Sequence, residues 1–216
     1  MGKIVSTEVK YRPKTLSEYV FPNDEVREVA MAYASGNQSR PLILHGTFGT
    51  GKSLLAELIP HAIETEVKPR IEKVKSFELH SSKEICEQFE KNKNFDLLFG
   101  RQKFNYFIVE EVNFVVKGAD AFRVIMDKYL GTDLIILTSN EIHKVDGGIK
   151  SRCKCLHVPP CEPHVFLPRA LDIVHSEGYD IDPKELLAML EAVYDVKPDN
   201  RRYYEKIDEL LQTVAA

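Results

Sequence analysis

A glycine-rich segment near residue 50 carries the most specific chemistry in this sequence of 216 residues. Residues 46–53 read GTFGTGKS and fit the pattern G-x-x-x-x-G-K-[ST] in full. The glycines let the backbone curl so that successive N–H groups face a phosphate. Lys52 can then reach the β- and γ-phosphates of a nucleotide, and the Ser53 hydroxyl can bind Mg²⁺. The expected nucleotide contacts are Gly46, Thr47, Phe48, Gly49, Thr50, Gly51, Lys52, Ser53 and Leu54.

Two carboxylates follow an apolar segment farther along the chain. Residues 106–109 (YFIV) read as a buried strand, and Glu110 and Glu111 come directly after it. In ATPases with a phosphate-binding loop, the first acid steadies the Mg²⁺ shell and the second polarises the attacking water. Glu110 is one methylene longer than the usual Asp, so it would hold the metal through a shifted water or more weakly. Two solvated carboxylates are the alternative, but beside the loop we favour a catalytic pair in which Glu110 binds Mg²⁺ and Glu111 activates water.

Two further polar residues lie close to apolar segments. Asn140 follows residues 133–138 (DLIILT), and an amide at the carboxyl end of a central strand can touch the γ-phosphate or its water. Asn is also a common turn residue. Arg152 lies in an expected loop before the last strand, where an arginine could act on the ATP of a neighbouring subunit. Without the other motifs, Arg152 would more simply be a surface residue.

Short apolar segments that alternate with helical patterns must position these residues. We expect buried strands at 41–45, 74–79, 106–109, 133–138 and 156–158. We expect helices at 23–35, 53–64, 82–91, 119–129, 162–177, 183–194 and 201–213. This alternation predicts an α/β fold with a five-stranded parallel sheet and helices on both faces. No strand is expected after Pro160, so we predict a sheet-based domain at 1–160 and a small domain of three helices at 161–216.

The composition is that of a folded protein, with 44% hydrophobic and 29% charged residues and a formal net charge of −4. It excludes a disordered tail and a disulfide-stapled mini-protein. No apolar run approaches the roughly 20 residues that span a bilayer, so we expect no membrane partner. Without a secretory signal, the four cysteines read as free thiols of an intracellular protein. They are Cys86, Cys153, Cys155 and Cys161, and their spacing fits no zinc motif.

Taken together, these motifs resemble one family, the AAA+ ATPase subunits of sliding-clamp loaders of the replication factor C small-subunit type. Residues 10–16 (KYRPKTL) look like the N-terminal box that wraps the adenine, which implies contacts by Tyr11, Arg12 and Pro13. Residues 151–153 coincide with the SRC motif, whose arginine, here Arg152, acts in trans. These two motifs are the specific part of the resemblance, which extends over about residues 8–205.

The resemblance also implies roles for residues elsewhere in the chain. Asn140 falls on the family's sensor 1, and residues 198–202 resemble the sensor 2 segment of the lid, with Arg201 as its arginine. Where the family has an Asn that can hold the catalytic Glu inactive, this sequence has His80 or Ser81, and His80 could take that role. The family's two prolines in the phosphate-binding loop are missing. The family's helical collar domain, which follows the lid, is also expected to be absent.

The implied function is that of a Mg²⁺-ATP-hydrolysing subunit of a clamp loader. Its partners would be other AAA+ subunits, identical or not, a sliding clamp and primer-template DNA, in the cytoplasm or nucleus, or in host cytoplasm for a phage protein. Candidates for DNA phosphate contacts are Lys83, Lys117 and Arg123, which could equally be solvated. One alternative is an ATP-gated DNA- or protein-binding module with little turnover, which Glu110 would favour. Another is a different AAA+ machine such as a helicase loader, against which the N-terminal box and the SRC motif count.

Overall fold

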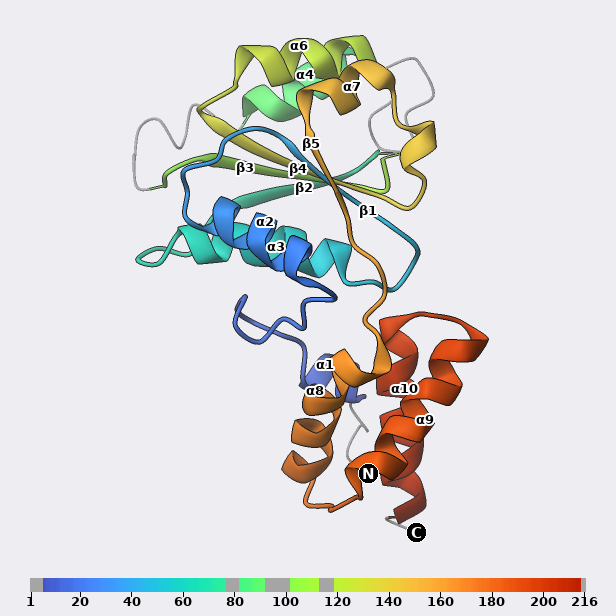
Figure 1. Cartoon of the computed structure of the whole chain (residues 1–216). Coiled ribbons are helices and arrows are strands. Elements are labelled where there is room, and N and C mark those ends of the chain that lie inside the picture. The colour runs from blue at the N-terminus through green and yellow to red at the C-terminus, as the bar shows by residue number, and fades with distance from the viewer. Residues whose placement is uncertain (1–5, 77–81, 92–101, 113–118, 215–216) are drawn as a thin grey trace. The chain divides into compact units, whose positions relative to one another are not determined.

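The computed structural model describes residues 6–76, 82–91, 102–112 and 119–214 (Figure 1). The chain divides into two compact units. The sheet unit comprises residues 25–46 and 52–158, and the helical unit comprises residues 1–24, 47–51 and 159–216. The N-terminal segment therefore groups with the C-terminal helices. The domain division at residue 160 that the sequence suggests stays a prediction.

Five parallel strands form the sheet, in the order β2-β3-β4-β1-β5. They are β1 (Leu42–His45), β2 (Ile71–Lys75), β3 (Asn105–Glu110), β4 (Asp133–Ser139) and β5 (Lys154–His157). The predicted α/β class and five-stranded parallel sheet are confirmed. Strand β2 begins at Ile71, three residues before the predicted start, and residues 77–79 of the predicted range lie outside the described residues. An edge strand buries little, here Val74 alone, so a search for apolar runs misplaces it.

Helices cover both faces of the sheet (Figure 1). Helices α2 (Asp24–Ala34) and α3 (Lys52–Ile63) lie on one face. Helices α4 (Ser82–Lys91), α6 (Ala119–Lys128) and α7 (Gly147–Arg152) lie on the other, and a short 3₁₀ turn at Ile142–Lys144 precedes α7.

Helix α7 corrects the sequence analysis, which expected Arg152 in a loop. The two glycines that begin α7 have low helix propensity and conceal it in the sequence. The cap is Asp146, whose carboxylate accepts hydrogen bonds from the N–H groups of Gly148 and Ile149 at 2.9 and 3.1 Å. Arg152 is consequently the last residue of a helix.

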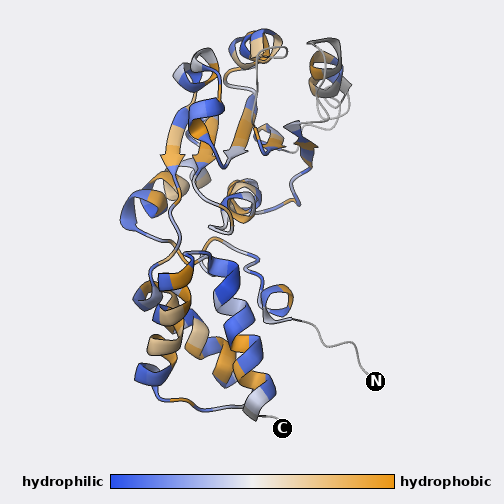
Figure 2. Cartoon of the chain, turned by 90° about the vertical axis from the view of Figure 1, so that its right-hand side faces the viewer, coloured by the Kyte–Doolittle hydropathy of each residue, from blue (hydrophilic) through white to orange (hydrophobic). Residues whose placement is uncertain are grey.

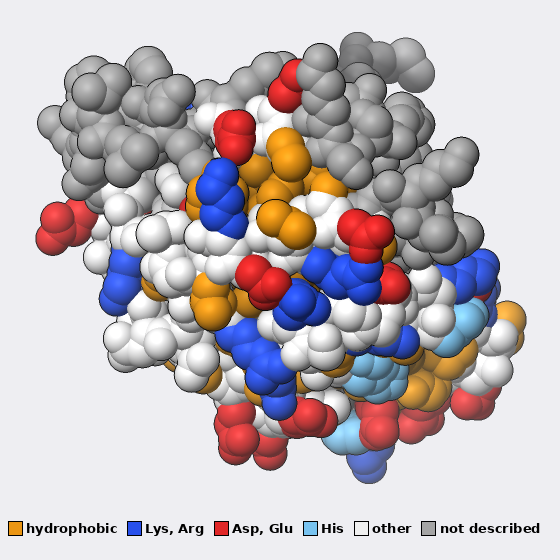
Figure 3. Space-filling view, turned by 90° about the horizontal axis from the view of Figure 1, so that it is seen from above, with side chains coloured by type: hydrophobic (Ala, Val, Ile, Leu, Met, Phe, Trp, Pro, Cys, Tyr) orange, Lys and Arg blue, Asp and Glu red, His pale blue; other side chains and the backbone are white. Residues whose placement is uncertain are grey.

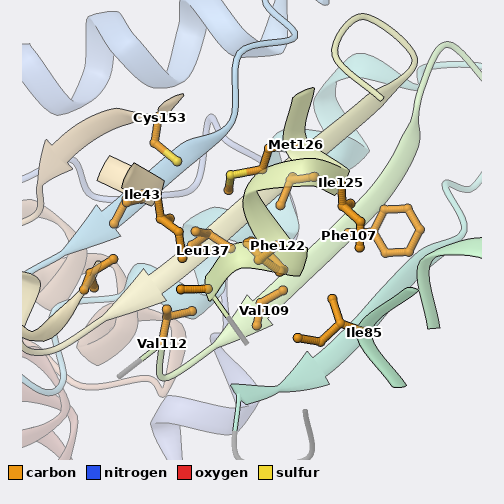
Figure 4. Close-up of a cluster of buried hydrophobic side chains, with 14 of the residues drawn as sticks. Ile43, Ile85, Phe107, Val109, Val112, Phe122, Ile125, Met126, Leu137 and Cys153 are labelled. Carbon is orange, nitrogen blue, oxygen red and sulfur yellow. The ribbon is translucent and has the colours of Figure 1, made fainter. Parts of the chain in front are cut away.

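The core beneath α4, α6 and α7 fixes these helices on the sheet. Phe122 and Met126 of α6 point toward the strands (Figure 4). Phe107 of β3 stacks on Phe89 of α4 with ring centroids 4.2 Å apart. Each such side chain stabilises the fold by about 1.5–3 kcal/mol when fully buried. These contacts hold α4 and α6 against the face of the sheet.

The helical unit contains α1 (Thr7–Lys10), α8 (Pro163–Ser176), α9 (Pro183–Val196) and α10 (Asn200–Val214). Each of α8, α9 and α10 carries both apolar and polar residues (Figure 2), and their apolar residues form a second core around Phe166 and Tyr203. The first helix expected from the sequence begins at residue 23, so the short helix α1 is an addition that the sequence analysis missed. Thr7 anchors α1 to α10, because its N–H donates to Asp208 at 3.0 Å and its hydroxyl to the Tyr204 carbonyl at 3.2 Å.

Candidate nucleotide site

The carboxyl ends of β1, β3 and β4 lie side by side at one edge of the sheet. His45 pairs with Ser139, and the N–H of Gly46 donates to the Ser139 carbonyl at 3.2 Å. Asn140 therefore comes directly after Ser139, the residue that binds the first residue of the phosphate-binding loop. On the other side of β4, the Ser139 hydroxyl donates to the Val112 carbonyl at 3.0 Å. The structure thus brings Gly46, Asn140 and the chain just after Glu111 to the same edge, because parallel strands end together.

Lys52 and Ser53 open helix α3 at this edge. The Lys52 ammonium donates to the Gly46 carbonyl at 3.0 Å, and the residue is only 6% exposed. Ser53 is exposed, and Leu54 is partly exposed. A buried ammonium at a helix N-terminus makes this edge attractive to anions, because the helix dipole and the charge act together.

Glu111 has an unusual backbone. Its φ is 56°, the one positive value at a non-glycine residue in the described part of the chain. Its N–H donates to the Thr138 hydroxyl at 3.2 Å, and its carbonyl accepts a short hydrogen bond from the Ser76 hydroxyl. Such a conformation costs about 1–3 kcal/mol and persists where its surroundings impose it, often at functional sites. The exposed Glu111 side chain is thereby aimed from a fixed backbone, while half-buried Glu110 ends β3.

Within the helical unit, residues 47–51 of the phosphate-binding loop contact the start of α10. The N–H of Asn200 donates to the Gly49 carbonyl at 3.2 Å. Gly49 has φ 73°, and a Cβ added there would collide with the Asp199 carboxylate. Glycine is needed at this position on both counts. Asp199 also accepts a hydrogen bond from the N–H of Arg201 at 3.0 Å, so the loop and the first turn of α10 are held together.

Tyr19 supports the loop from the N-terminal segment. Its hydroxyl lies 3.4 Å from the Thr50 carbonyl and 3.5 Å from the Gly51 carbonyl, and it fills the space that a Cβ on Gly51 would need. Burial raises the pKa of Tyr19, so it stays a neutral donor. The sequence analysis did not single out Tyr19, because nothing in its local pattern marks a contact with residues 31 and 32 positions away.

The predicted adenine-binding segment is bound to α8 and to Glu177, the residue that follows it. The Tyr11 hydroxyl donates to Glu177 at 2.7 Å, and the Tyr11 carbonyl accepts from Arg169 at 2.6 Å. Burial raises the pKa of Tyr11, and the hydrogen bond to Glu177 raises it further. Pro13 is buried and Arg12 is exposed. Their adenine contact stays a prediction.

The two predicted arginines differ in how they are held. Arg201 is exposed, and its Nε lies 3.9 Å from Glu8. Arg152 forms two parallel hydrogen bonds with the Asp127 carboxylate, from Nε and NH2, each 2.8 Å long. Its NH1 donates to the Gly148 carbonyl at 2.9 Å. The hydrogen bond from Arg152 lowers the pKa of Asp127, which therefore remains a carboxylate at neutral pH.

Some predicted residues stand apart from this edge. Arg123 pairs with Asp120 and lies 3.5 Å from Asp146, and its DNA contact stays a prediction. His80 and Lys117 lie outside the described residues, as does the side chain of Lys83. Among the described residues, the four cysteines are free thiols, no cluster of metal-binding side chains occurs, and no helix is long and apolar enough to cross a membrane.

The fold and this edge define a class of protein. A phosphate-binding loop between β1 and α3, acidic residues at the end of β3 and the order β2-β3-β4-β1-β5 are those of the AAA+ fold. In keeping with this, domain III of the replication initiation protein DnaA from Thermotoga maritima superposes with a TM-score of 0.62. The match covers 92% of this chain and 88% of that one at 16% identity, which shows the fold alone.

The sequence is similar to those of several replication proteins. A replication factor C small subunit from Staphylothermus marinus is 27% identical over 96% of this chain and 61% of its own length. A putative replication factor C small subunit from Acanthamoeba polyphaga mimivirus is 25% identical over 69% of this chain and 48% of its own. Replication factor C subunit 3 from Schizosaccharomyces pombe is 23% identical over 84% and 53%.

The chain is therefore similar in sequence to replication factor C subunits. No family model matches the sequence. The chain spans about half to two thirds of the length of these curated relatives.

Proposed function

We propose that this chain hydrolyses Mg²⁺-ATP as a subunit of a DNA sliding-clamp loader. The observation that carries the proposal is the edge where Lys52, the fixed backbone of Glu111 and Asn140 follow three adjacent strands. A buried cation, an aimed carboxylate and an amide are the groups that phosphoryl transfer to water requires. The similarity to replication factor C subunits supports the placement in clamp loading.

The residues at this edge fit a magnesium nucleotide. Ser53 and Glu110 offer hard oxygen ligands, which Mg²⁺ prefers, and Lys52 with the N-terminus of α3 offers positive charge for phosphate. Bound Mg²⁺ would neutralise charge that develops on the phosphate oxygens. The hydrogen bond to the Gly46 carbonyl keeps the Lys52 ammonium close to the first residue of the phosphate-binding loop.

The remaining residues act on water, phosphate and the neighbouring subunit. Glu111 orients the attacking water and accepts its proton. Asn140 hydrogen-bonds the γ-phosphate or that water. Arg201 senses the γ-phosphate, and Arg152 reaches the ATP of a neighbouring subunit. ATP binding between subunits would then drive assembly on primer-template DNA and the sliding clamp.

The direct test is ATP turnover by the purified chain, alone and with primed duplex DNA and a clamp. We expect turnover that rises with DNA and clamp, and that Glu111→Gln abolishes while ATP binding persists. Glu66→Gln is the matched control, because Glu66 is an exposed carboxylate beyond the far end of α3. Equal turnover in both variants would contradict the role of Glu111.

A second function is favoured by Glu110, which stands where related ATPases have Asp and which would hold the metal through a shifted water or more weakly. In it the chain is an ATP-gated binding module with little turnover. Tight ATP binding without turnover by the unmodified chain, with DNA and clamp present, would support this function and overturn the first. A third possibility is another AAA+ machine such as a helicase loader. The mass of the complex with an ATP analogue, measured with and without primed DNA, distinguishes the two functions above from this possibility. A discrete assembly that needs both ligands supports clamp loading.

A further inference from the structure

Arg152, the last residue of α7, has its side chain held by several hydrogen bonds although it is partly exposed. Asp127 lies on α6, and its carboxylate takes the Nε and NH2 donors of Arg152 at equal distances of 2.8 Å. This bidentate geometry fixes both the position and the plane of the guanidinium. NH1 is bound in turn by the Gly148 carbonyl, one helical turn back on α7. The side chain of Arg152 is thus oriented by two elements.

The backbone of the same residue is held by a third element. Arg40 lies between α2 and β1, and its NH2 donates to the Ser151 carbonyl at 3.0 Å. Its Nε donates to the Arg152 carbonyl at 3.3 Å. Carbonyls at a helix C-terminus lack partners within the helix, so a cation there both satisfies them and complements the dipole. Arg40 therefore fixes the turn from which the Arg152 side chain extends.

The guanidinium keeps donors for another molecule. It carries five N–H groups, and these contacts use Nε–H and one N–H on each terminal nitrogen. Within the described part of the chain, one N–H on NH1 and one on NH2 are left over after these contacts. The Arg152 side chain is 35% exposed. Seen from above, the surface carries basic and acidic side chains that adjoin each other (Figure 3). A phosphate from another molecule can therefore be met without breaking the pair with Asp127.

We propose that Asp127 is a positioning residue that presents Arg152 to the ATP of a neighbouring subunit, with Arg40 fixing the backbone beneath it. This inference rests on the proposed function of Arg152 in trans. An exposed ion pair adds little to the stability of a fold. Stability alone therefore does not account for the bidentate contact with Asp127 or for the hydrogen bonds to the Gly148, Ser151 and Arg152 carbonyls. The arrangement instead removes rotamer freedom from a long side chain before it meets its target.

The test measures ATP turnover by full-length chains assembled with ATP on primed duplex DNA. The variants are Asp127→Ala, Asp127→Asn, Asp127→Glu, Arg152→Ala and the double variant Asp127→Ala/Arg152→Ala. We expect Asp127→Ala to lower kcat by about 10- to 100-fold, because misplacing a catalytic group by about 1 Å can cost that much. The KM for ATP should stay unchanged, since each chain's own phosphate-binding loop is intact. Asp127→Glu should restore part of kcat, and Asp127→Asn, which loses charge and one acceptor, should lie between Ala and Glu.

The double variant identifies the mechanism. If Asp127 acts through Arg152, the double variant turns over no more slowly than Arg152→Ala alone. Glu209→Ala is the matched control, because it breaks an exposed ion pair with Lys206 in α10, and it should leave kcat unchanged. Thermal unfolding of each variant confirms folding.

The outcomes separate this inference from the proposed function. If Arg152→Ala turns over normally, the trans role of Arg152 is wrong. If Arg152→Ala is slow but both Asp127→Ala and Asp127→Asn turn over normally, the trans role stands and the positioning role is wrong. Additive losses in the double variant would also overturn it.

Discussion

The residues proposed to act on the chain's own ATP are held differently from the arginine proposed to act on a neighbour's. Glu111 is fixed through its backbone, by Thr138 and Ser76, and its side chain is exposed. Arg152 is fixed through its side chain, by Asp127 and the Gly148 carbonyl. Hydrogen bonds to the backbone fix the position of the Glu111 Cα but leave its side chain free to rotate toward water. The ion pair with Asp127 instead fixes the plane of the Arg152 guanidinium. Substitutions at Thr138 and at Asp127 therefore test the backbone contact and the side-chain contact separately.

The largest effect is expected at the cation of the chain's own site. Lys52→Ala removes the buried ammonium at the start of α3, and we expect ATP turnover to fall by at least about 100-fold, with ATP affinity reduced. Binding of a fluorescent ATP analogue and steady-state turnover measure both effects. Lys144→Ala removes an exposed lysine paired with Glu141 and should change neither. Unchanged ATP affinity in Lys52→Ala would contradict the site.

Gly49 tests the backbone clamp between the loop and α10. Gly49→Ala places a methyl group at φ 73° and against Asp199, and we expect a loss of about 1–3 kcal/mol in the free energy of unfolding. Gly178→Ala is the matched control, since its φ is 86° but no atom lies within 4 Å of the added Cβ. Denaturant unfolding of both variants isolates the contact with Asp199. Equal losses would show that this contact contributes nothing.

Thr138 tests the backbone clamp on Glu111. Thr138→Val leaves the Glu111 N–H without its hydroxyl acceptor, which costs about 1 kcal/mol of stability. Because the Glu111 backbone would then be less restrained, its carboxylate would be positioned less accurately. We therefore expect kcat to fall roughly 10-fold while the KM for ATP stays unchanged. Steady-state kinetics check the split. A normal kcat in a variant of lowered stability would mean that the clamp serves folding alone.

The smallest effect is expected from His45, at the end of β1. Burial lowers its pKa, followed by the charges of His157, whose ring centroid lies 5.3 Å away, and of Lys52. A folded-state pKa below the ordinary value of 6.5 means that stability is present above that pH and is lost as the pH falls through the folded pKa. Thermal unfolding temperature should fall on acidification below about pH 6.5, and His45→Gln should flatten that slope. Parallel slopes for both proteins would contradict this assignment.

The sequence predicts which polar residues directly follow a strand, but it does not predict the hydrogen bonds between elements that are far apart in the chain. Lys52, Glu111 and Asn140 each follow an apolar run, and parallel strands end at one edge, so their proximity could be foreseen. Thr138 was readable only as the polar last part of an apolar strand. The left-handed backbone of Glu111 depends on hydrogen bonds from two other strands' ends, which no local pattern encodes.

The contacts of Arg152 were out of reach of the sequence for the same reason. Asp127 is 25 positions away and Arg40 is 112, and each meets Arg152 only after α6 and α7 pack on the sheet. Helix α7 itself was missed because Gly147 and Gly148 mask its start. Strand β2 began earlier than predicted because an edge strand buries few residues. The sequence was therefore sufficient for the sheet and its edge, and insufficient for the parts held by side chains.

The most direct test of the shared site is to mix two inactive variants. Arg152→Ala chains keep their own site but cannot complete a neighbour's, and Glu111→Gln chains donate Arg152 but cannot activate water. The two are assembled together with ATP on primed duplex DNA, and turnover is compared with each variant alone. We predict partial recovery of turnover in the mixture, because some Arg152→Ala sites then face an intact arginine. No recovery, with assembly confirmed by the mass of the complex, would contradict a site shared between subunits.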